Sequence, residues 1–363
     1  MRKNSATFRV AQLFSWGADN PYQELLASAL AQHEIEVDQP QPRPFLLPSL
    51  WRGGRRPDVV HVQSAIPYFR ARGETLSNLK VLALVAQLWA MRLFGVKIVW
   101  TAHDTTKHGV RFPRQERRVG SALARLAHAI IVHCPAAVQE VEMQFGIDNR
   151  AKIHVIPHGN YVGAYADSIS PADARARLGL PSEKIVLLCL GLLHPYKGIE
   201  RLVSALERAG PHVHLVIAGK PISKEYAAEL GERVAHASNV TYSPRFVPVD
   251  DIQVYMRAAD VVVFAYPEIL TSGALVLAMS FAKACVAPGM GCIPEMLDPQ
   301  GGIIYDARGA DGLAAALRQV VQRCDDLPLM GARNLERVRQ WSWERVAAMT
   351  LDVYRSCKPR RIV

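Results

Sequence analysis

The sequence of 363 residues lacks the short motifs that mark several large enzyme classes. No Gly-x-Gly-x-x-Gly follows a predicted strand, which argues against a standard dinucleotide oxidoreductase. Gly-x-x-x-x-Gly-Lys-Ser/Thr and Gly-x-Ser-x-Gly are also absent, which argues against a P-loop ATPase and an α/β-hydrolase. No pair of histidines has the spacing of a zinc site. These absences argue against a metal enzyme, and we expect neither a metal nor another cofactor.

Cysteines are few and show no Cys-x-x-Cys pair. The six lie at positions 134, 189, 285, 292, 324 and 357. Cys189 and Cys285 fall inside apolar runs and are predicted to be buried free thiols. This usage suits a reducing cytosol.

Long hydrophobic runs are missing as well. No stretch of about 18 apolar residues is free of charges, so no transmembrane helix is expected. The nearest candidate, 81–100, is interrupted by Arg92 and Lys97. The first eight residues lead into a short strand and do not resemble a signal peptide. These features predict a cytoplasmic protein.

The chain has fewer acidic than basic residues, and the difference is larger in its N-terminal half. The chain has 43 Lys and Arg against 33 Asp and Glu, a net charge of +10. Residues 1–170 carry 20 of these bases against 13 acids. Such an excess favours anionic membrane surfaces, nucleic acid or phosphorylated ligands, with a solvated basic surface as the alternative. No nucleic-acid recognition motif accompanies it, so we expect no nucleic-acid partner.

Strand-like and helical segments alternate along the chain. Predicted strands cover 8–14, 59–62, 97–101, 129–133, 153–156, 185–190, 213–217, 240–242, 261–264, 284–287 and 302–305. This rhythm predicts parallel sheets covered on both faces, with ligands at the carboxyl ends of the strands. The length favours two domains, and the polar stretch 160–181 is interpreted as the linker between them.

Two strand–loop–helix corners in the second half predict a phosphate site. Thr271, Ser272 and Gly273 open an apolar helical run directly after a strand. The first amides of a helix lack internal partners, and the helix dipole adds positive charge there. The second corner, 191–198, supplies Lys197 as a point charge. A diphosphate would fit both corners; plain helix capping by Ser272 and a surface position for Lys197 are the alternatives.

Polar residues follow other strands at the same predicted edges. His103 and Asp104 follow strand 97–101 and would act as a general base or hold a sugar hydroxyl, or else form a polar cap. His158 follows strand 153–156, where a hinge turn is the alternative. Glu295 follows strand 284–287 and would accept two sugar or ribose hydroxyls, or simply complement a helix N-terminus.

Further positions have a structural interpretation beside a functional one. Asn20 and Tyr22 follow the first strand, where acceptor binding and a helix start signal are equally compatible with the sequence. His61, inside an apolar strand, is predicted to be a satisfied core histidine, and His133 is left open. The segment 78–94 is apolar around most of a helix, which favours a buried packing helix. An interfacial helix flanked by the basic stretches 52–56 and 111–118 is the alternative.

Taken in order, these landmarks resemble the GT-B glycosyltransferases of the family 4 kind, and among them the xanthan-type exopolysaccharide mannosyltransferases. The matching segments are 20–22, 101–104, 156–159, 191–198, 258–260, 271–275, 278–279 and 293–295. The resemblance implies an α/β protein of GT-B fold, with two Rossmann-like doubly wound domains and an interdomain cleft. The expected parts are an acceptor domain (1–165), a sugar-nucleotide domain (166–340) and a C-terminal helix (341–363) that returns to the first domain.

The resemblance also assigns roles to residues. Lys197 would hold the donor diphosphate, and the amides of Ser272, Gly273 and Ala274 would cradle it, with Thr271 beside them. His158 and Glu295 complete the expected donor site, Asn20 and Tyr22 the acceptor site, and Asp104 or His103 would be the catalytic base. The implied reaction moves a sugar from GDP-mannose or a UDP-sugar to a lipid-linked saccharide, by an enzyme peripheral on the inner, anionic face of the cell membrane.

Three positions depart from the family pattern. Many relatives have an arginine where this chain has Leu192, and two glutamates where it has Ile269 and Leu277. The second glutamate usually holds the ribose, so Glu295 or Glu268 would have to replace it. Two alternatives follow: an inverting reaction in place of a retaining one, and a non-catalytic protein that binds a sugar nucleotide or saccharide.

Overall fold

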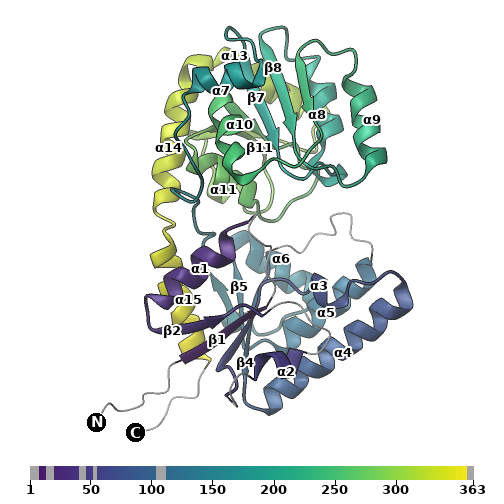
Figure 1. Ribbon diagram of the computed structural model, residues 1–363, viewed down its shortest axis with the longest axis vertical. Helices are drawn as coiled ribbons and strands as arrows, with labels where there is room; N and C mark the ends of the chain where they lie inside the picture. Colours follow the sequence, from purple (N-terminus) through teal and green to yellow (C-terminus); the bar gives the residue numbers. More distant parts are fainter. Residues whose placement is uncertain (1–7, 14–19, 41–45, 52–54, 104–111, 358–363) are drawn as a thin grey trace. The chain divides into compact units, whose positions relative to one another are not determined.

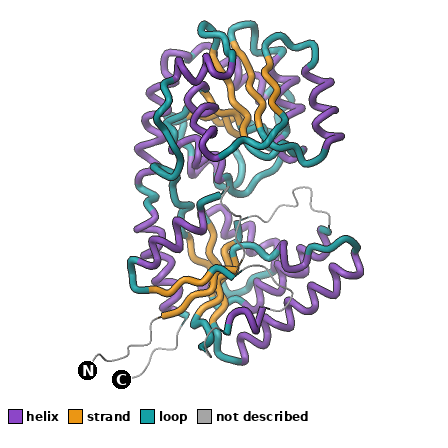
Figure 2. Tube along the Cα trace, viewed as in Figure 1, coloured by secondary structure: helices purple, strands orange, loops and turns teal. Residues whose placement is uncertain are grey.

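The computed structural model describes residues 8–13, 20–40, 46–51, 55–103 and 112–357. The chain divides into two compact units, residues 1–157 with 343–363 (unit 1) and residues 158–342 (unit 2). Each unit is a parallel β-sheet with helices on both faces (Figures 1 and 2). The predicted α/β class with two doubly wound domains is confirmed.

Unit 1 contains a six-stranded sheet in the order β2-β1-β3-β4-β5-β6. Its strands are β1 (Phe8–Leu13), β2 (Ile35–Asp38), β3 (Val59–Val62), β4 (Lys97–Thr101), β5 (Ala129–Val132) and β6 (Ile153–Val155). Its helices are α1 (Tyr22–Ala31), α2 (Leu46–Leu50), α3 (Ile66–Phe69), α4 (Glu74–Leu93), α5 (Pro113–Leu126), α6 (Pro135–Phe145) and α15 (Trp343–Ser356), with η1 (Arg150–Lys152) before β6. Strands β3 and β5 are buried throughout, which suits sheets covered on both faces.

The last helix belongs to the core of unit 1. In Figure 1 the yellow α15 lies beside the purple α1, although the two are at opposite ends of the sequence. Val346, Ala347 and Leu351 pack with residues of α1 and the sheet. Tyr354 is fully buried, and its hydroxyl is hydrogen-bonded to the Nδ1 of His61 at 2.7 Å. The hydroxyl of Thr101 is hydrogen-bonded to the other ring nitrogen of His61, also at 2.7 Å. The prediction of a satisfied core histidine at His61 is confirmed.

Unit 2 contains a six-stranded sheet in the order β12-β11-β10-β7-β8-β9. Its strands are β7 (Ile185–Leu190), β8 (Val213–Ala218), β9 (Val240–Ser243), β10 (Val261–Val263), β11 (Ala284–Pro288) and β12 (Gly302–Tyr305). Its helices are α7 (Pro171–Leu178), α8 (Ile199–Leu206), α9 (Lys224–Val234), α10 (Ile252–Ala258), α11 (Gly273–Ser280), α12 (Ile293–Met296), α13 (Gly312–Gln322) and α14 (Leu327–Arg339), with η2 (Pro195–Lys197), η3 (Val249–Asp251) and η4 (Cys324–Asp326). Cys189 and Cys285 are buried and unbonded, as predicted.

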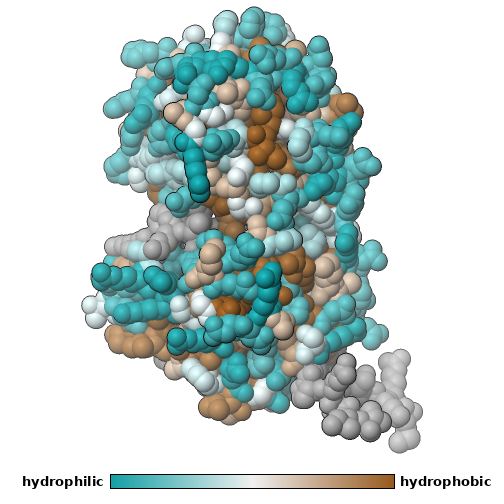
Figure 3. Space-filling view, turned by 180° about the vertical axis from the view of Figure 1, so that it is seen from behind, coloured by the Kyte–Doolittle hydropathy of each residue, from teal (hydrophilic) through white to brown (hydrophobic). Residues whose placement is uncertain are grey.

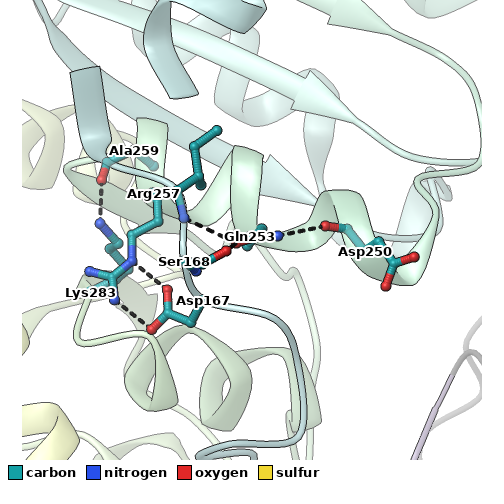
Figure 4. Close-up of polar contacts among 8 residues, drawn as sticks. Asp167, Ser168, Asp250, Gln253, Arg257, Ala259 and Lys283 are labelled. Carbon is teal, nitrogen blue, oxygen red and sulfur yellow. Dashed lines mark hydrogen bonds and ion pairs between the residues drawn. The ribbon is translucent and has the colours of Figure 1, made fainter. Parts of the chain in front are cut away.

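The segment interpreted as a linker, 160–181, is instead an ordered part of unit 2. It contains α7, whose start is capped by Ser170. Before α7, Asp167 pairs with Arg257 and the amide of Ser168 donates to Gln253 of α10 at 2.8 Å (Figure 4). The polar composition that suggested a linker therefore serves to attach this segment to α10.

Helix α4 differs from the favoured prediction of a buried packing helix. Val81, Leu84, Leu88 and Met91 are buried, but the opposite face is exposed and also apolar. The prediction failed because composition alone does not say which apolar residues find a partner. None of the helices among the described residues is long and apolar enough to cross a bilayer.

Candidate functional site

The two predicted phosphate corners are neighbours at one edge of the sheet in unit 2. Strand β10 pairs with β7, and the chain order reverses between these two strands. Such a switch point is where open α/β sheets bind ligands. Gly198 makes the close approach possible: it has a φ of +64°, and a Cβ at this position would lie 2.0 Å from the carbonyl oxygen of Ala265.

Lys197 lies inside this corner rather than on the surface. It is 7 % exposed, and its Nζ donates to the carbonyl oxygen of Leu190 at 3.0 Å. The same Nζ lies 5.9 Å from the centre of the Tyr266 ring. An ammonium group has three donors, so Lys197 keeps donors for an anion while it holds Leu190. The alternative of a surface lysine is therefore wrong.

Tyr266 connects Lys197 to the start of α11. Its hydroxyl lies 3.2 Å from the Oγ of Ser272. The Oγ of Ser272 in turn accepts the amide of Leu275 at 3.2 Å, so the helix cap that the sequence suggested is present. The amides of Gly273 and Ala274 make no hydrogen bond among the described residues. Two amides and one ammonium group thus share one corner, a combination suited to a diphosphate.

His158 lies at the same helix start. It is buried, and its Nδ1 donates to the carbonyl oxygen of Gly159 at 2.8 Å. A Cβ added at Gly273 would lie 3.3 Å from Nε2 of His158, so the ring covers the first residue of α11. Because Nδ1 donates, Nε2 is the acceptor nitrogen of the neutral ring, and it becomes a donor when the ring is protonated.

The remaining expected donor residues lie in the two loops around α11. The loop before α12 packs against the loop before α11, since the amide of Cys292 donates to the carbonyl oxygen of Leu270 at 2.7 Å. Glu295 on α12 is exposed, and Thr271 is half-buried beside Ser272. Ile269 occupies one of the two positions at which many relatives have a glutamate, and its side chain is buried.

In unit 1 the strand ends assemble a chain of histidines. The Nδ1 of His133 donates to the carbonyl oxygen of Ile156 at 3.0 Å, and its Nε2 lies 3.0 Å from the Nδ1 of His103. Burial lowers the pKa of His133 to about 4, so its ring is neutral and its Nε2 accepts. His103 must then carry its proton on Nδ1.

The other nitrogen of His103 faces an amide. Its Nε2 lies 2.8 Å from Oε1 of Gln63, the residue that follows β3. If His103 is protonated, its Nε2 donates to Oε1 of Gln63. If His103 is neutral, its Nε2 is an acceptor, and the side-chain amide of Gln63 must be turned so that its nitrogen faces the ring. The basic nitrogen of His103 is therefore Nε2. Asp104, the other candidate base, lies outside the described residues.

A cavity of about 220 Å³ opens beside His103 in unit 1. Its walls include Thr101, Arg117, Gln144 and the rings of Trp100 and Phe145. Aromatic walls with a few polar groups are typical of small-molecule sites.

Asn20 and Tyr22 have structural roles in the described structure. The Oδ1 of Asn20 accepts the amide of Tyr22, the first residue of α1, at 3.1 Å, so Asn20 forms a turn that leads into this helix. Tyr22 is 3 % exposed, and its ring makes edge contacts with His103 and Trp343. Their role toward an acceptor stays a prediction. Among the described residues no group of three or more acidic, histidine or cysteine side chains is arranged to hold a metal ion.

Two family models match the chain in succession. The model described as Glycosyltransferase Family 4 matches residues 36–160, and the one described as Glycosyl transferases group 1 matches residues 184–323. The chain belongs to the GT-B glycosyltransferases of the family 4 kind. The resemblance inferred from the sequence is confirmed.

Named relatives of this family 4 chain are bacterial transferases. The D-inositol 3-phosphate glycosyltransferase of Segniliparus rotundus is 30 % identical over 72 % of this chain and 61 % of its own length. The alpha-maltose-1-phosphate synthase of Mycolicibacterium smegmatis is 29 % identical over 73 % of this chain and 74 % of its own length. The chain therefore spans less than two thirds of the first of these relatives.

Solved structures share the fold. A sucrose-phosphate synthase from Thermosynechococcus elongatus superposes with a TM-score of 0.74 and 20 % identity, over 96 % of this chain and 98 % of that one. HepE from Anabaena, solved with UDP-glucose, superposes with a TM-score of 0.72 and 18 % identity, over 96 % and 98 %. Identities this low show the GT-B fold alone.

Sequence reasoning missed two residues of these sites, Tyr266 and Gln63, and left His133 open. Tyr266 links the two corners of unit 2, and Gln63 and His133 hold His103 in unit 1. Gln63 directly follows β3, so applying the strand-end rule to every strand would have found it, whereas His133 fell inside the predicted strand 129–133 and follows the observed β5.

Proposed function

We propose that this chain transfers a sugar from a nucleoside diphosphate sugar, GDP-mannose or a UDP-sugar, to a lipid-linked saccharide during assembly of an exopolysaccharide or capsule. The cluster of Lys197, Tyr266 and Ser272 carries the donor half of the proposal, because it joins a cation to two helix amides at a switch point. HepE, which has the same fold, was solved with UDP-glucose, and this supports a sugar nucleotide as donor.

The departing nucleoside diphosphate gains negative charge in the transition state. Lys197 and the amides of Gly273 and Ala274 would stabilise that charge without a metal ion. Glu295 or Glu268 would hold the ribose in place of the missing glutamate, and His158 would bind the donor beside the start of α11. Activity should therefore survive EDTA, and a loss that Mg²⁺ restores would contradict this part of the proposal.

The bond from the anomeric carbon to the donor phosphate breaks, and a bond to the acceptor oxygen forms. If the attack is in line, the acceptor hydroxyl gives its proton to a base, either His103 through Nε2 or Asp104. The cavity beside His103 would receive the acceptor sugar. NMR of the product's anomeric linkage distinguishes inversion from retention.

A second candidate is transfer to a small phosphorylated acceptor. Two relatives favour it, since one is a D-inositol 3-phosphate glycosyltransferase and the other an alpha-maltose-1-phosphate synthase, whose product is a sugar phosphate. In unit 1, the exposed Arg117 lines the cavity and would pair with a phosphate.

One experiment separates the two candidates. The purified chain is given a panel of radiolabelled GDP- and UDP-sugars with membrane lipid extract, and in parallel with inositol 3-phosphate or glucose 1-phosphate. Label in the organic phase supports the lipid-linked acceptor; label on the small phosphates supports the second candidate. Absence of transfer in every arm would overturn both.

A further inference from the structure

We propose that the exposed face of α4 is a docking surface for an anionic lipid membrane. Thirteen large hydrophobic side chains are exposed among the described residues, and six of them lie on α4 or directly after it. These six are Leu76, Leu79, Leu82, Trp89, Leu93 and Phe94, and we call them the α4 stripe. Each is between 49 % and 83 % exposed.

The spacing of the stripe places all six on one side of the helix. At 3.6 residues per turn they fall within an arc of roughly 140°, and Ala83 and Ala86 fill the gaps between them. The buried Val81, Leu84 and Leu88 lie on the opposite side. The face is about 30 Å long, from 20 residues at 1.5 Å each.

Charges border the stripe without entering it. The helix has three charged residues, Glu74, Lys80 and Arg92. Arg92 donates to the carbonyl oxygen of Leu126, away from the stripe, and Lys80 donates to the carbonyl oxygen of Arg70 at its edge. Glu74, at the first turn, accepts from Gln115 of α5 at 3.3 Å.

Further cations lie at both ends of α4. A guanidinium nitrogen of Arg56 would lie 2.7 Å from a Cβ added at Gly95, next to the end of the stripe. Arg118 donates to Oδ1 of Asn78 at 3.0 Å, near its start. Figure 3 shows brown side chains at the lower edge of unit 1, on the side where α4 lies, among teal ones.

These observations favour a lipid surface over a protein partner. A single convex helix face offers no groove for a protein to enter, but an apolar strip of this shape fits the boundary between headgroups and acyl chains. Trp89 and Phe94 are aromatic residues of the kind found at that boundary. The cations at the edge would meet anionic headgroups while their stems cover apolar surface.

The inference deepens the proposed function, because a lipid-linked acceptor is held at such a surface.

Flotation with vesicles of phosphatidylcholine, with or without phosphatidylglycerol, tests the docking surface on the full chain. The variant Leu82→Glu/Trp89→Glu should bind mixed vesicles at least about tenfold less than the unsubstituted protein, because two carboxylates enter the apolar arc. The matched control is Met143→Glu/Leu329→Glu, two equally exposed apolar positions on α6 and α14, and it should float normally.

Two further measurements define the contact. Brominated lipid should quench part of the tryptophan fluorescence, and Trp89→Phe should remove that part. Lys80→Gln/Arg56→Gln should lower binding to mixed vesicles and leave binding to neutral vesicles unchanged.

Three outcomes would overturn the inference: equal flotation of the stripe variant and the control, equal binding of the unsubstituted protein to neutral and anionic vesicles, or a dimer that the stripe variant abolishes while no vesicle binds. Calorimetry of GDP and UDP on the same proteins reports the site in unit 2 separately. Vesicle binding without nucleotide binding would refute the proposed function and leave the docking surface standing.

Discussion

At the scale of single residues, Lys197 is the side chain on which the donor site depends most. Its burial and its contacts with Leu190 and Tyr266 hold the ammonium group at the end of β7. Among the residues that the structure describes, no carboxylate forms an ion pair with this buried ammonium group, and a diphosphate would supply the counter-charge.

We therefore expect Lys197→Ala to weaken binding of the nucleoside diphosphate by about 1–3 kcal/mol, the range for a charge-assisted contact. Lys197→Met, which keeps the apolar stem, should weaken binding to a similar extent. Isothermal calorimetry measures the affinity, with the exposed Lys224→Ala as control. Unchanged affinity in Lys197→Ala would remove Lys197 from the site.

The buried histidines of unit 1 predict how its stability depends on pH. Burial lowers the pKa of His61 to about 3 and of His133 to about 4. Because the unfolded chain protonates near 6.5, it binds more protons than the folded one in the window below that pH. Stability from His133 is therefore complete above pH 6.5 and falls toward pH 4, by a total on the order of 3 kcal/mol.

Thermal unfolding at steps between pH 7 and pH 5 checks this, above the range where most carboxylates titrate. The variant His133→Asn should show a flatter dependence of Tm on pH than the unsubstituted protein. The exposed His33→Asn is the control and should keep the original slope. Parallel slopes for all three proteins would show that His133 is not the titrating group.

At the scale of elements, the start of α11 combines two tasks at adjacent atoms. The side chain of Ser272 caps the helix, while the amides after it are open to a ligand. Capping serves stability and the amides serve binding, so substitutions can separate the two.

Ser272→Ala should cost about 1 kcal/mol of stability and change nucleotide affinity little, because every amide is kept. Ser272→Pro should lower the affinity by at least about tenfold, since it removes an amide and forces φ from −137° toward −65°. Denaturant unfolding and calorimetry measure the two effects. Equal affinities in the two variants would mean that the helix start does not bind the donor.

At the scale of the whole molecule, α15 joins the end of the sequence to the core of the first unit. Tyr354 is fully buried there and holds His61, so its loss leaves both a large cavity and an unpaired ring nitrogen. Unit 2 contains no residue after Ser342, so its donor site depends on other contacts.

Tyr354→Ala should therefore destabilise unit 1 by about 3–5 kcal/mol, the range for removing a buried aromatic ring. Nucleotide affinity should change little, because the donor corner lies in unit 2. Denaturant unfolding followed by limited proteolysis measures the first effect and calorimetry the second, with the exposed Arg355→Ala as control. A loss of nucleotide affinity equal to the loss of stability would show that the two units do not respond separately.

The sequence by itself determined the features that depend on neighbouring residues. Strands such as β3, β4 and β7 were predicted with their observed bounds, because a run of β-branched and aliphatic residues between polar ends is a local signal. The Ser272 cap is equally local, since a cap bonds an amide three residues away. The ordered landmarks were enough to identify the family.

The tertiary structure alone decided which of these features meet. Tyr266 lies beside Lys197, and His133 fixes the proton of His103; each of these two contacts joins segments that follow different strands and are far apart in the sequence. Burial was also decided by the tertiary structure alone. Helix α4 is apolar on two faces, but only one of these faces is covered by the rest of unit 1. Burial and hydrogen bonding between distant segments depend on how the sheet orders its strands, and no local pattern of residues encodes that order.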